Sequence, residues 1–308
     1  MRIPPHAGFV CFPIPTEMSM TTRARSAFAT ATMAMLAALL GACASAPSKV
    51  APPKSPTRDQ VTAAAIEHVL AGEHRSATSR ARDEYVHPLD TLLFFGIKPD
   101  MTVVEVWPGS AGWFTEVLAP LLAARGRLYA AQFEPKAGSA YISGSLATYT
   151  RKLAARPDLY GKVEVTALGP GGEPIAPAAS ADMVVTIRGI HDWMNLDFAP
   201  QAFAAMYKAL KPGGVLGVVE NRGNAAKPQD PHAASGYVNE DYAIALIEAA
   251  GFELVARSGI NANPKDTKDY EQGVWALPPD YRLGNRDRAK YQEIGESDRF
   301  TLRFRKPM

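Results

Sequence analysis

Residues 103–120 read VVEVWPGSAGWFTEVLAP, and this stretch decides the fold. A run rich in valine predicts a buried strand that ends near Glu105. Gly109 and Gly112 then permit a tight loop whose backbone can approach a ligand closely. A helical pattern begins near Phe114, and the free N–H groups at its start favour an anionic ligand group. The stretch therefore predicts a strand, a ligand-binding loop and a helix.

The same alternation of strands and helices continues along the chain. We expect strands at residues 102–106, 127–131, 162–166, 183–187, 215–220, 252–257 and 299–305. Helical patterns occupy residues 115–124, 145–155, 200–210 and 240–250. This alternation predicts a doubly wound α/β fold with a mostly parallel seven-stranded sheet. Because no helix separates the last two strands, we expect an antiparallel pair at the C-terminal edge.

The N-terminal 43 residues have the pattern of an export signal. Two arginines precede an apolar stretch at 27–40 that ends in small residues. LGAC at 40–43 resembles the lipobox of bacterial lipoproteins, which implies that Cys43 carries a lipid. We therefore expect a periplasmic protein that contacts the outer membrane through this anchor alone. Residues 1–17 show no signal character, so the true start is expected after them.

Residues 44–58 are rich in proline and are expected to form an extended tether. Residues 59–308 are expected to form one domain, with 261–298 as a lid because this connection is too long for a hairpin turn. Trp275 is expected to give this lid an aromatic wall. The formal net charge is +2, and removal of residues 1–42, with three arginines and one glutamate, leaves the chain near neutral. This balance excludes the strongly basic class of nucleic-acid-binding proteins.

A second motif, LKPGG at 210–214, precedes the fifth expected strand. Its proline ends a helix and its glycines turn the chain into the strand. In this place the motif resembles class I S-adenosylmethionine-dependent methyltransferases. VTIRGIHDWM, ALKPGGVLGVVENR and INANPKDTKDY extend the resemblance to a bacterial family of exported methyltransferases, over about residues 60–306. The resemblance implies transfer of a methyl group from S-adenosylmethionine to a small molecule or an envelope component.

The resemblance also implies which residues hold S-adenosylmethionine. Glu105 takes the place of the acid that lies near the methionine part of the cofactor. The loop that surrounds the cofactor corresponds to Pro108, Gly109, Ser110, Ala111 and Gly112. The acid that binds the ribose hydroxyls is replaced by Gln132, with Glu134 two residues later on the same strand face. Arg188, after the fourth strand, is expected beside the cofactor. No pattern of metal ligands occurs.

The candidates for catalysis follow later strands. His191 is expected to act as a general base or to orient an acceptor, with Asp192 beside it, unless it only caps a helix. Neighbouring residues usually point apart, so no dyad is expected between these two. Glu220 ends the fifth strand at the same edge, where a solvated loop is the alternative. His232 and Tyr237 fall in a loop expected to overhang the site.

Trp107, Ala111 and Gln132 depart from the pattern that the resemblance leads us to expect. They leave open a second hypothesis, a non-catalytic envelope lipoprotein that uses the same fold to bind another ligand. Binding of S-adenosylmethionine discriminates between the two.

Overall fold

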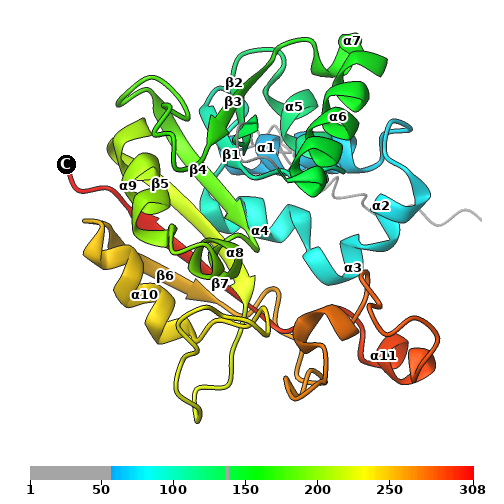
Figure 1. Ribbon diagram of the computed structural model, residues 1–308. Coiled ribbons are helices and arrows are strands. Elements are labelled where there is room, and N and C mark those ends of the chain that lie inside the picture. Colours follow the sequence, from blue (N-terminus) through cyan, green and yellow to red (C-terminus); the bar gives the residue numbers. More distant parts are fainter. Residues whose placement is uncertain (1–56, 136–138) are drawn as a thin grey trace, which may run out of the picture. The chain divides into compact units, whose positions relative to one another are not determined.

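A seven-stranded sheet lies at the centre of the computed structural model, which describes residues 57–135 and 139–308 (Figure 1). The strands are β1 (Thr102–Val106), β2 (Arg127–Phe133), β3 (Val163–Leu168), β4 (Ala181–Ile187), β5 (Leu210–Asn221), β6 (Glu253–Ser258) and β7 (Arg299–Arg305). Their order is β3-β2-β1-β4-β5-β7-β6. Strand β7 pairs antiparallel with β5 and β6, and the other pairings are parallel. The predicted fold class is confirmed, with β7 between β5 and the edge strand β6.

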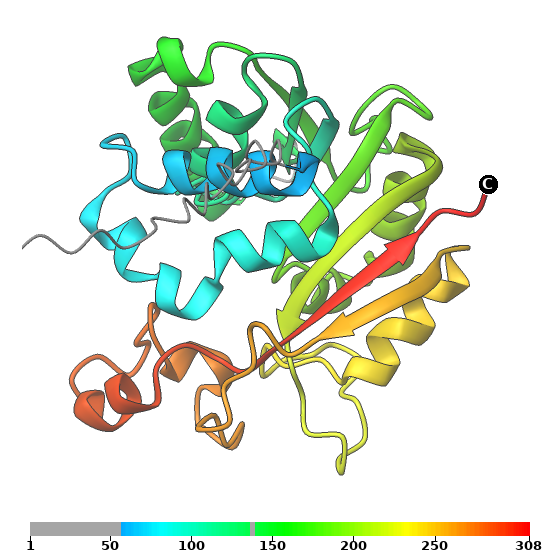
Figure 2. The ribbon, with the colours of Figure 1, turned by 180° about the vertical axis from the view of Figure 1, so that it is seen from behind.

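Helices cover both faces of the sheet. One face is covered by α8 (Ile190–Asn195), α9 (Ala199–Ala209) and α10 (Glu240–Ala249). The other is covered by α1 (Arg58–Leu70), α4 (Pro88–Phe95) and α5 (Thr115–Leu122), with α6 (Ala140–Ala155) and α7 (Pro157–Tyr160) beside them (Figure 2). The connections contain α2 (Ala77–Ala81), α3 (Asp83–Val86), the 3-10 helix η2 (Gly273–Ala276) and α11 (Arg288–Ile294). A sheet covered on both faces buries the apolar strands that the sequence predicts.

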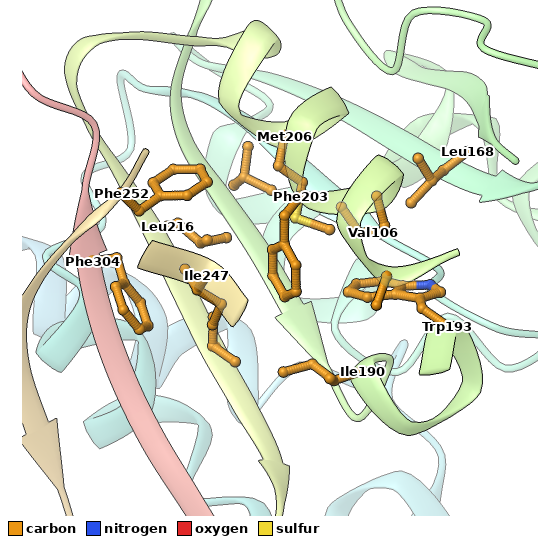
Figure 3. Close-up of a cluster of buried hydrophobic side chains, with 14 of the residues drawn as sticks. Val106, Leu168, Ile190, Trp193, Phe203, Met206, Leu216, Ile247, Phe252 and Phe304 are labelled. Atoms are coloured by element: carbon orange, nitrogen blue, oxygen red, sulfur yellow. The ribbon is translucent and has the colours of Figure 1, made fainter. Parts of the chain in front are cut away.

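The core on the α8–α10 side fixes the position of α8. Val104 and Val106 point from β1 into this core, because alternate residues of a strand share a face. Trp193 of α8 and Phe203 of α9 are fully buried there, with ring centroids 5.6 Å apart (Figure 3). An edge-to-face pair of this kind adds about 1 kcal/mol to the burial of its apolar surface. The packing anchors α8 at the carboxyl end of β4.

The LKPGG segment forms the start of a strand rather than a turn before it. Strand β5 begins at Leu210, which pairs with Ala181, and the register shifts between Ala181 and Met183. Gly213 has a φ of +75°, and its N–H donates to the Lys306 carbonyl at 2.9 Å. The expected start at residue 215 was late because proline and glycine disfavour regular strands, although they are tolerated at irregularities such as this one.

The N-terminal signal, Cys43 and the tether up to residue 56 lie outside the described residues, so their assignment stays a prediction. The first described helix, α1, begins at Arg58. Thr57 caps it through a reciprocal pair of hydrogen bonds with Gln60. Within the described ranges, none of the helices has both the length and the apolar character that crossing a membrane requires.

Candidate functional site

A cavity of about 250 Å³ opens at the carboxyl ends of β1 and β4. The strand order reverses between these two strands, and ligands of open α/β sheets bind at such a switch point. The cavity wall includes Glu105, Pro108, Gly109, Ser110, Ala111 and Arg188. The structure therefore brings six of the nine expected cofactor residues to one cavity. Another cavity, of about 370 Å³, lies against the starts of β2 and β3, at the opposite end of these strands.

Glu105 is almost completely buried in the wall of this cavity, with 3% of its surface exposed. The Thr115 hydroxyl donates to Oε2 of Glu105 at 2.6 Å and lies 3.0 Å from the Tyr149 hydroxyl. Burial raises the pKa of Glu105 to about 7, although the hydrogen bond from Thr115 and the charge of Lys152 act in the opposite direction. Near neutral pH the carboxyl group is therefore present in both its neutral and its ionised form.

The loop after β1 is held by a side chain that the sequence assigned to the cofactor. Gln132 is fully buried, and its Nε2 donates to the Gly109 carbonyl at 2.7 Å. Contrary to expectation, this amide positions the loop instead of facing a ribose. Gly112, with a φ of +54°, packs on Tyr149, whose ring would lie 2.7 Å from a Cβ. At Gly109, with a φ of +68°, a Cβ would meet no atom within 4 Å.

Trp107 separates this cavity from a larger one of about 680 Å³, since its side chain lines both. Its backbone has a φ of +49°, which is rare for a residue other than glycine. The indole N–H donates to the Leu168 carbonyl at 3.1 Å, and the ring centroid lies 4.7 Å from that of Phe133. The indole therefore stands in the wall of the Glu105 cavity and leaves it open.

The larger cavity brings together residues from α8 and from the segment before β7. His191, Asp192 and Arg188 line it, and Trp275 and Arg282 contribute from the 261–298 segment. Glu134 lines it as well, while its Oε2 accepts from the Gly171 N–H at 2.9 Å. Glu134 is thus placed in the second cavity and not in the cavity of Glu105.

His191 forms a buried pair with Glu220, which ends β5. Nδ1 of His191 lies 3.0 Å from Oε1 of Glu220, and the glutamate side chain is fully buried. The Glu220 carboxylate also accepts backbone N–H groups from Ile190 at 2.7 Å, His191 at 3.3 Å and Asn221 at 2.7 Å. A carboxylate only accepts, so Nδ1 is assigned a proton, and in the neutral ring Nε2 keeps its lone pair. Glu220 therefore does not lie in a solvated loop.

The electrostatics of this pair favour a strong base. Burial alone lowers the pKa of His191, but the charge and hydrogen bond of Glu220 outweigh it and raise the pKa above its ordinary value. Nε2 of His191 also lies 3.7 Å from Oδ1 of Asp192, closer than the sequence led us to expect for neighbouring residues. An imidazole oriented by a carboxylate can accept a proton from a ligand in the cavity.

An arginine cluster lies beside Glu105, and sequence reasoning missed its member Arg299. Arg82 and Arg299 line the smaller cavity and both bind the carboxylate of Glu296, Arg82 through Nε at 2.5 Å. Burial alone raises the pKa of Glu296, but the hydrogen bonds and charges of both arginines bring it to about 2. Arg299 is 1% exposed, although it begins a strand in which arginine or threonine alternates with apolar residues. The signal available in the sequence was the arginines of this alternating pattern, RFTLRFR at 299–305.

Two candidates for catalysis line neither of the two cavities at this edge. The His232 side chain is 57% exposed, and its Nδ1 lies 3.8 Å from Oδ1 of Asp197. Tyr237 is buried, and its hydroxyl lies 3.0 and 3.1 Å from the two oxygens of Asp266. The structure therefore does not bring these residues to the site. No group of three or more His, Cys, Asp or Glu side chains suited to a metal occurs in residues 57–135 and 139–308.

Comparison with known proteins identifies relatives of this fold. No protein-family model matches the sequence, and a search of curated proteins also found no match. Among solved structures, the chain is similar to a SAM-dependent methyltransferase from Aquifex aeolicus, with 16% identity, a TM-score of 0.50 and coverage of 79% of this chain and 98% of that one. It is also similar to the [4+2]-cyclase SpnF, with 15% identity, a TM-score of 0.51 and coverage of 83% and 98%. The chain therefore has the Rossmann-like fold of class I methyltransferases.

Proposed function

We propose that the chain is a methyltransferase that binds S-adenosylmethionine in the Glu105 cavity and an acceptor in the larger cavity. The observation that supports this best is the shared wall of the two cavities, to which Trp107, Phe133 and Arg188 contribute. One cavity presents a buried carboxyl group, and the other presents a histidine backed by a carboxylate. A reaction between two ligands needs adjacent compartments, because the reacting atoms must be held in line.

The residues around the smaller cavity fit the charges of S-adenosylmethionine. Glu105 offers a carboxyl group, and a positively charged ligand group beside it favours its ionised form. Arg188 offers a guanidinium for the carboxylate of the methionine part. Gly109 has no side chain, and no atom lies within 4 Å of the position of a Cβ there, so a ligand can approach the loop backbone. When bound, S-adenosylmethionine supplies a methyl group on a positively charged sulfur, which needs no further activation.

His191 and Glu220 supply the proton acceptor. Glu220 fixes the ring through Nδ1, which leaves Nε2 to accept a proton from the ligand in the larger cavity. General-base assistance of this kind contributes about 10²- to 10⁴-fold to a rate. Methyl transfer otherwise depends on alignment and exclusion of water, so the aromatic wall formed by Trp107 and Trp275 assists it.

Replacement of Gly109 with tryptophan is expected to abolish binding of S-adenosylhomocysteine, the demethylated product, by the full chain. The new indole enters open space in a cavity of about 250 Å³. The positive φ of residue 109 costs a residue with a side chain about 1–2 kcal/mol of stability. Gly284→Trp is the matched control, because Gly284 has a φ of +64° and open space outside both cavities. Titration calorimetry measures both, with circular dichroism to show folding. Equal binding by the two folded variants would contradict this placement of the cofactor.

A second candidate function is binding of another ligand without methyl transfer. It is favoured by the Gln132 amide, which binds the Gly109 carbonyl and provides no carboxylate for a ribose. The cyclase SpnF, which is similar in fold, is named for a different reaction, so the fold is compatible with other chemistry. This candidate predicts no heat when millimolar S-adenosylmethionine is titrated into the folded full chain.

We further propose that the protein is exported and anchored through Cys43, where its acceptor is a small molecule or an envelope component. The proposal rests on the LGAC sequence at 40–43 after an apolar stretch. In Cys43→Ser, the protein is expected to leave the membrane fraction and to lose the mass of the attached lipid. Membrane fractionation and mass spectrometry of the full chain in a bacterial host measure both. An unchanged membrane fraction would refute lipidation at this residue.

A further inference from the structure

The larger cavity is lined by aromatic side chains and has an apolar mouth. Trp107, Phe133, Tyr141 and Trp275 all contribute rings to its wall. Tyr141 is 71% exposed and Leu196, also in the wall, is 60% exposed. Solvent-exposed apolar side chains that gather at a cavity mark a ligand site, because their contact with water is unfavourable and a ligand can replace it. The cavity therefore suits a ligand with a flat apolar body.

The groups on the wall that can carry a charge are balanced in number. Two guanidinium groups, from Arg188 and Arg282, oppose three carboxyl groups, from Glu134, Asp192 and Asp280. The Arg282 guanidinium also lies over the Trp275 ring, 4.4 Å from its centroid. The His191 imidazole adds a third group that can be positive, so the wall selects neither an anion nor a cation from solution. The cavity fits a neutral ring compound better.

The base and one aromatic wall lie within reach of a single small ligand. The centroids of the His191 and Trp275 rings are 6.1 Å apart, and the ring planes meet at 66°. A hydroxyl group at hydrogen-bond distance from Nε2 therefore brings an attached ring into contact with the indole. An aliphatic hydroxyl is too weak an acid to give up its proton readily to an imidazole, whereas an aromatic hydroxyl is a far stronger acid.

We propose that the acceptor is a neutral aromatic hydroxyl compound whose ring packs on Trp275 and whose hydroxyl group meets Nε2 of His191. This inference rests on the proposed function. The O–H bond of the ligand breaks and the proton moves to Nε2, which leaves a phenolate beside an imidazolium that Glu220 stabilises. Glu220 acts as a positioning residue, since it contacts the ring of His191 and not the ligand.

The experiment titrates the full chain with 4-nitrophenol, whose phenolate absorbs visible light and whose neutral form does not. Below the pH at which the free probe ionises, the native chain is expected to bind it and show phenolate absorption. His191→Gln is expected to retain binding within about threefold and to lose this absorption, and Glu220→Gln to shift its onset to higher pH. Trp275→Leu is expected to weaken binding about tenfold, the effect of about 1.4 kcal/mol. His68→Gln, on the exposed side of α1, is the matched control and is expected to change neither quantity.

Cyclohexanol, an aliphatic alcohol of similar size, is expected not to displace the probe, a test that needs no variant. Absence of binding at millimolar probe, displacement by cyclohexanol, or unchanged phenolate absorption in His191→Gln overturns the proposal. If S-adenosylhomocysteine binds and the phenol does not, only this inference fails. If the phenol binds with the expected spectrum and neither S-adenosylmethionine nor its product binds, the phenol site stands and the proposed function fails.

Discussion

Replacement of Glu105 with glutamine is expected to stabilise the folded chain by about 3 kcal/mol at pH 8. The pKa of this carboxyl group is about 7 in the folded chain, against 4.5 for an ordinary glutamate. Each unit of difference corresponds to about 1.4 kcal/mol. A neutral amide retains the acceptor that the Thr115 hydroxyl needs and removes the cost of burying a charge. The same substitution is expected to weaken binding of S-adenosylmethionine at least about tenfold, through loss of the negative charge.

The sign of the pH dependence identifies this effect. Between pH 4.5 and 7 the unfolded chain loses the proton of Glu105 while the folded chain retains it. Native stability therefore falls as the pH rises through this window, and the full cost is present above pH 7. The glutamine variant lacks this dependence, so its advantage is expected at pH 8 and absent at pH 4. Urea unfolding of the native chain and the variant at both pH values measures the difference.

Glu116→Gln is the matched control for this prediction. Glu116 is also buried, with 4% of its surface exposed, but Nζ of Lys152 lies 2.5 Å from its Oε1. Nε of Arg75 lies 3.8 Å from Oε2. Removal of this charge leaves Lys152 without a carboxylate partner, whereas Arg75 keeps its pair with Asp83, and is expected to destabilise the chain. If Glu105→Gln destabilised the chain at pH 8 as Glu116→Gln does, Glu105 would be a structural ion-pair residue. It would then not be a buried carboxyl group whose charge costs stability.

Replacement of Glu296 with glutamine is expected to cost about 3–5 kcal/mol at pH 7, the usual loss when one partner of a buried ion pair is removed. The carboxylate binds Arg82 at 2.5 and 3.0 Å and also binds Arg299. With a folded pKa of about 2, Glu296 contributes stability above pH 4.5, and this contribution is lost as the pH falls from 4.5 through 2. The variant is therefore expected to approach native stability near pH 2. Urea unfolding across this range measures the convergence.

Glu271→Gln is the control for Glu296, because Glu271 pairs with Arg286 at the surface, where both side chains are more than half exposed. Exposed pairs contribute little, so this variant is expected to unfold like the native chain. A loss for Glu296→Gln no larger than that for Glu271→Gln would contradict the inferred importance of the cluster.

The parts of the fold that sequence predicts best are those in which local pattern and burial agree. Strands β1 and β7 have the bounds expected from their alternating and β-branched residues, 102–106 and 299–305. The helix expected at 240–250 is α10, and Gly251, with a φ of +97°, follows its C-cap. Strand β5 begins earlier than expected, since its start depends on pairing with β4 and not on its own residues.

The parts of the site that escaped prediction depend on contacts between distant segments. His191 and Glu220 are 29 residues apart, and they meet because β4 and β5 pair in a register that aligns Ile187 with Val219. The sequence placed both residues at one sheet edge but not against each other. Gln132 likewise lies at the expected end of β2, while the carbonyl that it binds belongs to the loop after β1. Side-chain partners of this kind depend on strand order and register, and the local periodicity of the sequence does not determine either of these.

The most direct test of the account is the number of protons released when S-adenosylmethionine binds. Calorimetric titrations of the full chain at pH 7, in buffers of different ionisation enthalpy, measure this number. Because the pKa of Glu105 is about 7, binding of the positive ligand is expected to release about half a proton per site. The release is expected to be absent from Glu105→Gln at saturating ligand. No binding at millimolar ligand, or binding with equal proton release by both proteins, would contradict the claim that Glu105 meets the cofactor.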